Sequence, residues 1–79
     1  MENSQSKSAQ LQLTSIKAKI SILRLEKNIP DFILIHPKLY DLLTVVEHFR
    51  NYCILKGEIE NIKMIITPKV DNYKFVKLI

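Results

Sequence analysis

Apolar side chains recur in the first third of the chain at intervals of four, three, four and three residues. This spacing places them in one stripe along a helix, and the stripe consists of Ala9, Leu13, Ile16, Ile20 and Leu23. A strand is the alternative, because apolar and polar residues also alternate between positions 16 and 22. The end of the segment favours a helix, since Asn28 tolerates a left-handed cap and Pro30 prevents continuation. We expect this helix to begin at residue 9, after a disordered polar segment at residues 1–8.

Three more apolar residues, Leu11, Ile22 and Leu25, broaden the apolar part of this helix. A helix that is apolar over so wide an arc is expected to bury two sides. We expect one side to lie on a sheet and the other to lie elsewhere.

The segment from residue 31 to residue 57 predicts a strand followed by a helix. Residues 31–36 (DFILIH) are apolar on both faces, which is typical of a strand in a sheet that is covered on both sides. Pro37 suits the first turn of a helix, and apolar residues then follow at helical spacing as far as Cys53. Gly57, the only glycine in the chain, comes after the last of them and suits a left-handed cap.

Two short apolar segments complete the predicted sheet. Residues 62–67 (IKMIIT) predict a strand that Pro68 ends, and residues 73–78 (YKFVKL) predict another. Turn-forming residues at 68–72 indicate a hairpin loop between them. The first two strands are joined through a helix and should be parallel with a right-handed crossover, whereas the third returns antiparallel. The expected fold is a single small α/β domain over residues 9–79, in the order α-β-α-β-β, with a three-stranded mixed sheet packed by two helices.

The size of the chain, 79 residues, allows one domain. A chain this short buries only about 60% of its unfolded surface, so its own core is marginal. With one cysteine it can form no intramolecular disulfide, and small domains without disulfide or metal often gain stability by forming oligomers. No apolar run approaches the roughly 20 residues that span a bilayer. We therefore expect no membrane partner and a location in a cytoplasm.

Residues that could carry chemistry are few, and their spacing fits no known site. His48 and Cys53 lie five residues apart, which on an α-helix turns their side chains about 140° away from each other. His36 lies at the end of a predicted strand, and no fourth zinc ligand is evident. A chain with one glycine can hardly build a phosphate-binding loop. We expect Cys53 to pack as a small buried apolar residue, and we expect no metal, no cofactor and no catalytic site.

The net charge of +4 is concentrated at the two ends of the chain. Residues 1–29 hold five basic and two acidic side chains, and residues 62–79 hold four basic and one acidic. Residues 30–61 hold three basic and five acidic side chains. Nucleic-acid binding is therefore the second function we consider, with contacts from the lysines of the C-terminal hairpin, Lys63, Lys69, Lys74 and Lys77. The alternation of Tyr73 and Phe75 favours a core position for these aromatic rings, and arginine, on which base recognition relies, is scarce.

Protein–protein contact is the first function we consider, because the chain has more apolar surface than a three-stranded sheet can cover. Exposed apolar patches usually mark protein contacts. We expect the first helix, or an open edge of the sheet, to make such a contact, either in a homo-oligomer (a dimer or larger) or with another protein. The residues predicted for the interface are Ile16, Ile20, Leu23 and Leu25.

The segment IPDFILIHPKLYDLL at residues 29–43 resembles a recurring segment of bacteriophage capsid-type proteins. There, a PD-apolar-HP-x-x-Y-x-x-L stretch precedes a short strand, a proline and a closing strand, and residues 62–68 and 73–78 follow that order. The resemblance implies a small protein of phage or mobile-element origin, located in a host cytoplasm or a virion. Such proteins are assembly pieces, regulators or binders of host proteins, so the implied partners are the protein itself and other phage or host proteins.

Overall fold

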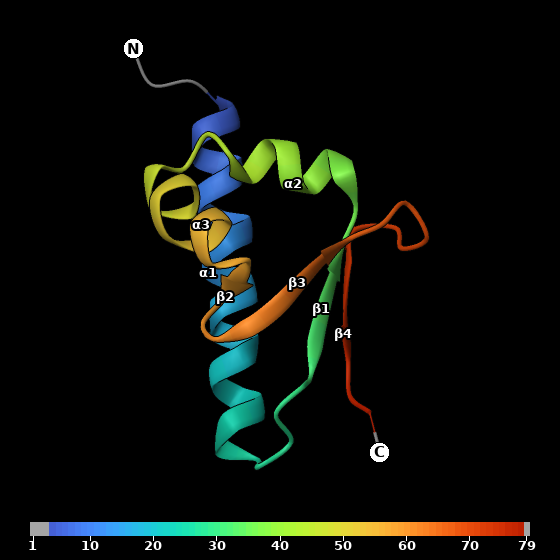
Figure 1. Ribbon diagram of the computed structural model, residues 1–79. Coiled ribbons are helices and arrows are strands. Elements are labelled where there is room, and N and C mark those ends of the chain that lie inside the picture. The colour runs from blue at the N-terminus through green and yellow to red at the C-terminus, as the bar shows by residue number, and fades with distance from the viewer. Residues whose placement is uncertain (1–3, 79) are drawn as a thin grey trace.

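The computed structural model describes residues 4–78 (Figure 1). They form a mixed domain of helices and a four-stranded sheet, which confirms the predicted α/β class. In chain order the elements are α1 (Ser4–Leu25), β1 (Phe32–Ile35), α2 (Pro37–Leu43), the π-helical turn η1 (Phe49–Cys53), α3 (Ile54–Lys56), β2 (Glu58–Ile59), β3 (Ile62–Ile66) and β4 (Tyr73–Val76).

The sheet has the strand order β2-β3-β1-β4. β1 and β3 are parallel, as predicted, and β4 is antiparallel to β1. Two predictions are wrong: the sheet has four strands rather than three, and residues 68–72 do not close a hairpin. Both errors have one cause, because the two-residue strand β2 occupies the second edge of β3. β4 therefore pairs with the free edge of β1, and the loop before it passes the end of that strand.

The first segment is a helix, and α1 begins five residues earlier than predicted. The stretch 4–8, which we expected to be disordered, is thus helical, while residues 1–3 lie outside the described residues. The predicted stripe faces the sheet, with four of its side chains almost fully buried: Ala9, Leu13, Ile16 and Ile20. The left-handed cap is Lys27, with φ of 57°, rather than the expected Asn28.

The predicted second helix is divided after Leu43. Thr44 begins a run of three β-branched residues, which favour helices weakly, and its hydroxyl donates to the carbonyl oxygen of Asp41 (2.5 Å). The guanidinium of Arg50 donates to the carbonyl oxygen of Thr44 (2.6 Å). This bond from the π-helical turn stabilises the break in the helix. Gly57 ends α3 with φ of 69°, which confirms the predicted cap.

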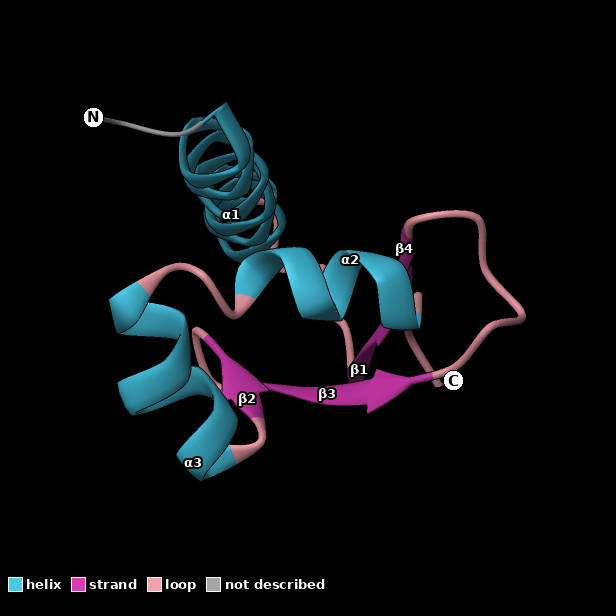
Figure 2. Ribbon diagram, turned by 90° about the horizontal axis from the view of Figure 1, so that it is seen from above, coloured by secondary structure: helices cyan, strands magenta, loops and turns pink. Residues whose placement is uncertain are grey.

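The sheet has helices over one face only. Figure 2 shows α1 and α2 on one side of the sheet and α3 beside β2 at its end. Ile33 and Ile35 of β1 point to the helices and are fully buried, whereas Phe32 and Leu34 alternate with them and stay partly exposed on the opposite face. The expectation that β1 lies in a sheet covered on both faces is therefore wrong for the described residues.

Candidate interaction surfaces and the pocket beside Cys53

The uncovered side of the sheet has an apolar centre. Cross-strand partners share a face of a sheet, so the register defines which side chains lie there. Phe32 lies opposite Lys63 on β3 and Val76 on β4, and Leu34 lies opposite Ile65 and Lys74. We call this surface the open face; its apolar members are Phe32, Leu34, Ile65 and Val76, all partly exposed.

The four lysines predicted to contact nucleic acid are not gathered at one place. Lys63 and Lys74 are exposed on the open face, on opposite sides of β1. Lys69 lies in the loop before β4, where its backbone N–H donates to the Thr67 hydroxyl (3.2 Å). Lys77 donates from Nζ to Asn28 Oδ1 (3.0 Å), in the connection that follows α1.

Two aromatic rings of β4 belong to the core. Tyr73 and Phe75 pack edge to face, with ring centroids 5.7 Å apart, and lie against the buried cluster. This confirms the core position expected from their alternation. Since they point away from the open face, Phe32 is the one aromatic residue among the open-face positions defined above.

The interface predicted on α1 is partly wrong. Ile16 and Ile20 are fully buried in the domain's own core, so they cannot contact another protein in this fold. Leu23 is half-buried, and only Leu25 is freely exposed. The reason is that the sheet takes the most apolar side of the helix. The large apolar residues left exposed on the rest of the helix are Leu11, Ile22 and Leu25.

Most of the cations of α1 point toward the rest of the domain. The Lys17 Nζ lies 3.6 Å from Glu60 Oε1, and the Arg24 guanidinium donates to the Glu60 carbonyl oxygen. The Lys19 ammonium lies 5.2 Å from the centre of the Tyr73 ring. The two contacts to Glu60 hold the turn between β2 and β3, where both Glu60 and Asn61 have positive φ, against the helix. The Lys19 contact instead joins the helix to β4.

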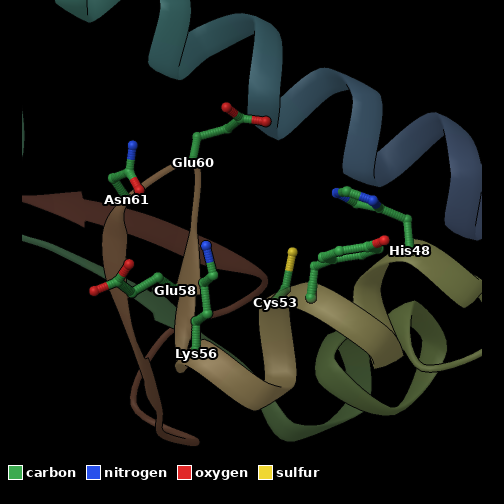
Figure 3. Close-up of a pocket in the computed structure, with 7 residues that line it drawn as sticks. His48, Cys53, Lys56, Glu58, Glu60 and Asn61 are labelled. Atoms are coloured by element: carbon green, nitrogen blue, oxygen red, sulfur yellow. The ribbon is translucent and has the colours of Figure 1, made fainter.

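A shallow pocket of about 190 Å³ lies between the π-helical turn and the β2–β3 turn (Figure 3). The sulfur of Cys53 points into it, with His48 on one side and Glu60 on the other. The residues that line the pocket are His48, Tyr52, Cys53, Lys56, Glu58, Glu60 and Asn61.

The pocket brings together two residues, His48 and Cys53, that α-helical spacing would separate. The N–H of Ile54 donates to the carbonyl oxygen of Phe49, five residues earlier, which is the π-helical pattern. This wider turn brings residues five apart onto the same side, and His48 and Cys53 both line the pocket. The angle of about 140° expected from α-helical geometry is therefore wrong here. Nothing in the local sequence identified the wider turn.

The thiol of Cys53 has a raised pKa in this pocket. Burial is the main cause that raises the pKa of Cys53; Glu60 raises it further, and Lys17 opposes the shift. A nucleophilic cysteine needs a lowered pKa. The His48 ring stacks on Tyr52 with centroids 4.9 Å apart. Among residues 4–78, no group of three or more His, Cys, Asp or Glu side chains could hold a metal ion. Cys53 thus packs as a buried residue, as predicted.

Comparison with protein-family models, curated proteins and solved structures finds no match to this chain. The similarity to phage capsid-type segments therefore stays a prediction. Within residues 4–78, the helices are too short or too polar for any of them to traverse a bilayer.

Proposed function

We propose that the protein is a non-enzymatic binding module that acts through protein–protein contacts, and that the open face is its docking surface. The main support is the uncovered apolar centre of the sheet, formed by Phe32, Leu34, Ile65 and Val76 between two lysines. Large uncovered apolar patches with a polar rim are the usual form of a protein-binding site.

The charges of the open face indicate the kind of partner. Lys63 and Lys74 flank the apolar centre, and Glu58 lies opposite Lys63 at the edge of the sheet. A partner that is apolar at the centre of its contact surface and acidic at the rim would pair with both lysines. The resemblance to phage capsid-type segments supports an assembly piece or a binder of host proteins within this class.

Nucleic-acid binding is the second candidate, because the same face carries Lys63 and Lys74 beside an aromatic ring, Phe32. Sheets that bind single strands stack successive bases on several aromatic side chains. Tyr73 and Phe75, the other aromatic residues of the sheet, face the core. We therefore favour a protein partner.

Affinity co-purification from the native host, with mass identification, tests this function. The wild type is compared with the open-face double variant Leu34→Gln, Ile65→Gln and with the control Leu55→Gln, which changes an exposed leucine of α3. We expect a protein that the wild type and the control retain and the open-face variant loses. Retention of the same protein by the open-face variant would rule out this surface.

Gel shifts with single- and double-stranded oligonucleotides at two salt concentrations test the second candidate. Binding that weakens steeply with salt and that Lys63→Gln, Lys74→Gln removes would favour nucleic acid over protein. We expect no such binding.

A further inference from the structure

The outer side of α1 repeats with a period of seven residues. Its positions follow one another at intervals of four, three, four and three, and they are Leu11, Ser15, Ala18, Ile22 and Leu25, the outer stripe. Each lies two residues after a member of the predicted stripe, on the opposite side of the helix. Leu11, Ile22 and Leu25 are 71%, 54% and 84% exposed. A seven-residue repeat is the pattern of a helix that packs lengthwise on another helix.

We propose that the outer stripe of α1 packs on the outer stripe of a second copy, in an antiparallel pair of helices related by a two-fold axis. The order of side-chain sizes from Leu11 to Ile22 is large, small, small, large, and it reads the same from both ends. An antiparallel pair that sets Ser15 opposite Ala18 also sets Leu11 opposite Ile22. A two-fold interface requires this kind of self-complementary surface.

The small central residues and the absence of charge favour this occupant. Ser15 and Ala18 allow two helix backbones to approach closely at the crossing point. No member of the outer stripe is charged, and Lys17, Lys19 and Arg24 are engaged with the domain's own Glu60 and Tyr73. A second copy carries the same net charge of +4, so a neutral surface lets it approach with less charge repulsion.

A groove beside the stripe provides a place for a side chain of the second copy. It has a volume of about 180 Å³ and lies between α1 and β4, lined by Lys19, Ile22, Leu23 and Phe75. The antiparallel register brings the second copy's Leu11 to Ile22, at the edge of this groove. Side chains that insert between residues of a facing helix are what hold helix pairs together.

The helix is accessible for this contact. α1 has 22 residues, a length of about 33 Å, and Figure 1 and Figure 2 show it along the outside of the fold, with α2 and the sheet on its inner side. A single helix pair buries less than the roughly 800 Å² per partner of a standard interface. We therefore expect a reversible dimer whose population depends on concentration. This surface is different from the open face, so it does not depend on the function proposed for that face.

A charge exchange tests both the contact and its register. Sedimentation equilibrium over micromolar to millimolar concentrations is measured for the wild type, for Leu11→Glu, for Ile22→Lys and for an equimolar mixture of the two variants. We expect the wild type to dimerise and each variant alone to dimerise at least about tenfold more weakly. We expect the mixture of the two variants to recover dimerisation. In the mixed dimer the introduced carboxylate faces the introduced ammonium, and the other contact keeps its native Ile22 and Leu11.

Circular dichroism of each variant checks that the fold is kept. We expect it to be kept, because Leu11 and Ile22 are both exposed. The open-face variant Leu34→Gln, Ile65→Gln is the matched control and should dimerise as the wild type does. A wild type that stays monomeric, or a Leu11→Glu variant that dimerises normally, would overturn the helix pair. A mixture that fails to recover would overturn the antiparallel register. None of these results depends on whether the open face binds a partner.

Discussion

The end of α1 offers a direct test of how the helix is terminated. Lys27 adopts a left-handed conformation, with φ of 57°. Its N–H donates to the carbonyl oxygen of Arg24 (3.0 Å), and the N–H of Asn28 donates to that of Leu23 (2.8 Å). This pair of bonds is the Schellman motif, in which the left-handed position is usually glycine. A residue with a β-carbon pays about 1–2 kcal/mol for this conformation.

Replacement of Lys27 by glycine should therefore stabilise the protein. Glycine relieves the left-handed strain but loses more backbone entropy on folding, which offsets about 0.5–1 kcal/mol. We expect Lys27→Gly to raise the free energy of unfolding by about 0.5–1 kcal/mol net. In a domain of this size, that corresponds to an increase in Tm of about 2–8 °C.

Urea unfolding followed by far-UV circular dichroism measures the change. Lys27→Ala is the first control and should leave stability nearly unchanged, because alanine keeps the left-handed strain. Asn28→Gly is the second control and should destabilise the protein, because Asn28 is not left-handed and its Oδ1 accepts a hydrogen bond from Lys77. If Asn28→Gly stabilised the protein and Lys27→Gly did not, the helix would end where the sequence placed its cap, and the reasoning would be refuted.

Three further predictions concern the second helical segment. Gly57→Ala should lower the free energy of unfolding in urea by about 1–2 kcal/mol, because alanine is strained in the left-handed conformation. Steric overlap should add nothing, because no atom lies within 4 Å of the added β-carbon. Gly57→Asn should lower the free energy of unfolding by less, because asparagine adopts this conformation more readily. Phe49→Ala should lower the free energy of unfolding by about 3–5 kcal/mol. The whole free energy of unfolding expected for 79 residues is roughly 4–12 kcal/mol, so circular dichroism should show partial unfolding of this variant. Burial raises the pKa of Cys53 above its ordinary 9.0, so the folded state holds the thiol proton more tightly than the unfolded state. Stability should thus fall as the pH rises above 9.0, and Cys53→Ala should remove that fall in pH-dependent urea unfolding.

The elements that the sequence predicts well are those with strong local signals. The helical period in α1, the unbroken apolar run of β1, and the prolines and the single glycine at the element ends each act within a few residues. The cap at Gly57 is correct because only glycine adopts a left-handed conformation freely. At Lys27 that conformation is imposed by the hydrogen bonds that end the helix, and the residue type gives no sign of it.

The features that the sequence does not predict depend on contacts between distant segments. β2 has two residues, too few to show an alternating pattern, yet its pairing with β3 decides where β4 can pair. The π-helical turn inserts one residue without a local marker, and it alone brings His48 and Cys53 to one pocket. The local sequence pattern indicates the preferred structure of a segment. The order of the strands and the residues that line a pocket depend instead on which strand edges and sheet faces other segments already cover.

The error in the predicted α1 interface has an instructive physical basis. The helical spacing of apolar residues identifies two stripes on α1, but spacing alone does not indicate which of them faces the sheet. The stripe with Ile16 and Ile20 is the more apolar, so the domain's own core buries it and stabilises the fold by doing so. A surface available to other molecules is then found on the weaker stripe, with Leu11 and Leu25. In a small domain, the strongest apolar pattern is therefore a poor guide to an interface.

The two uncovered surfaces lie on opposite sides of the molecule. The outer stripe is on the side of α1 that faces away from the sheet, and the open face is on the side of the sheet that faces away from α1. A pair of copies joined through α1 would therefore leave both open faces exposed and directed away from the interface. Such a dimer can hold two partner sites at once, which strengthens attachment to a repetitive surface without any new contact. We expect Leu11→Glu to weaken binding to an immobilised array of the partner and to leave binding to a single partner molecule in solution unchanged. Equal weakening in both formats would mean that α1 contributes to the partner site itself.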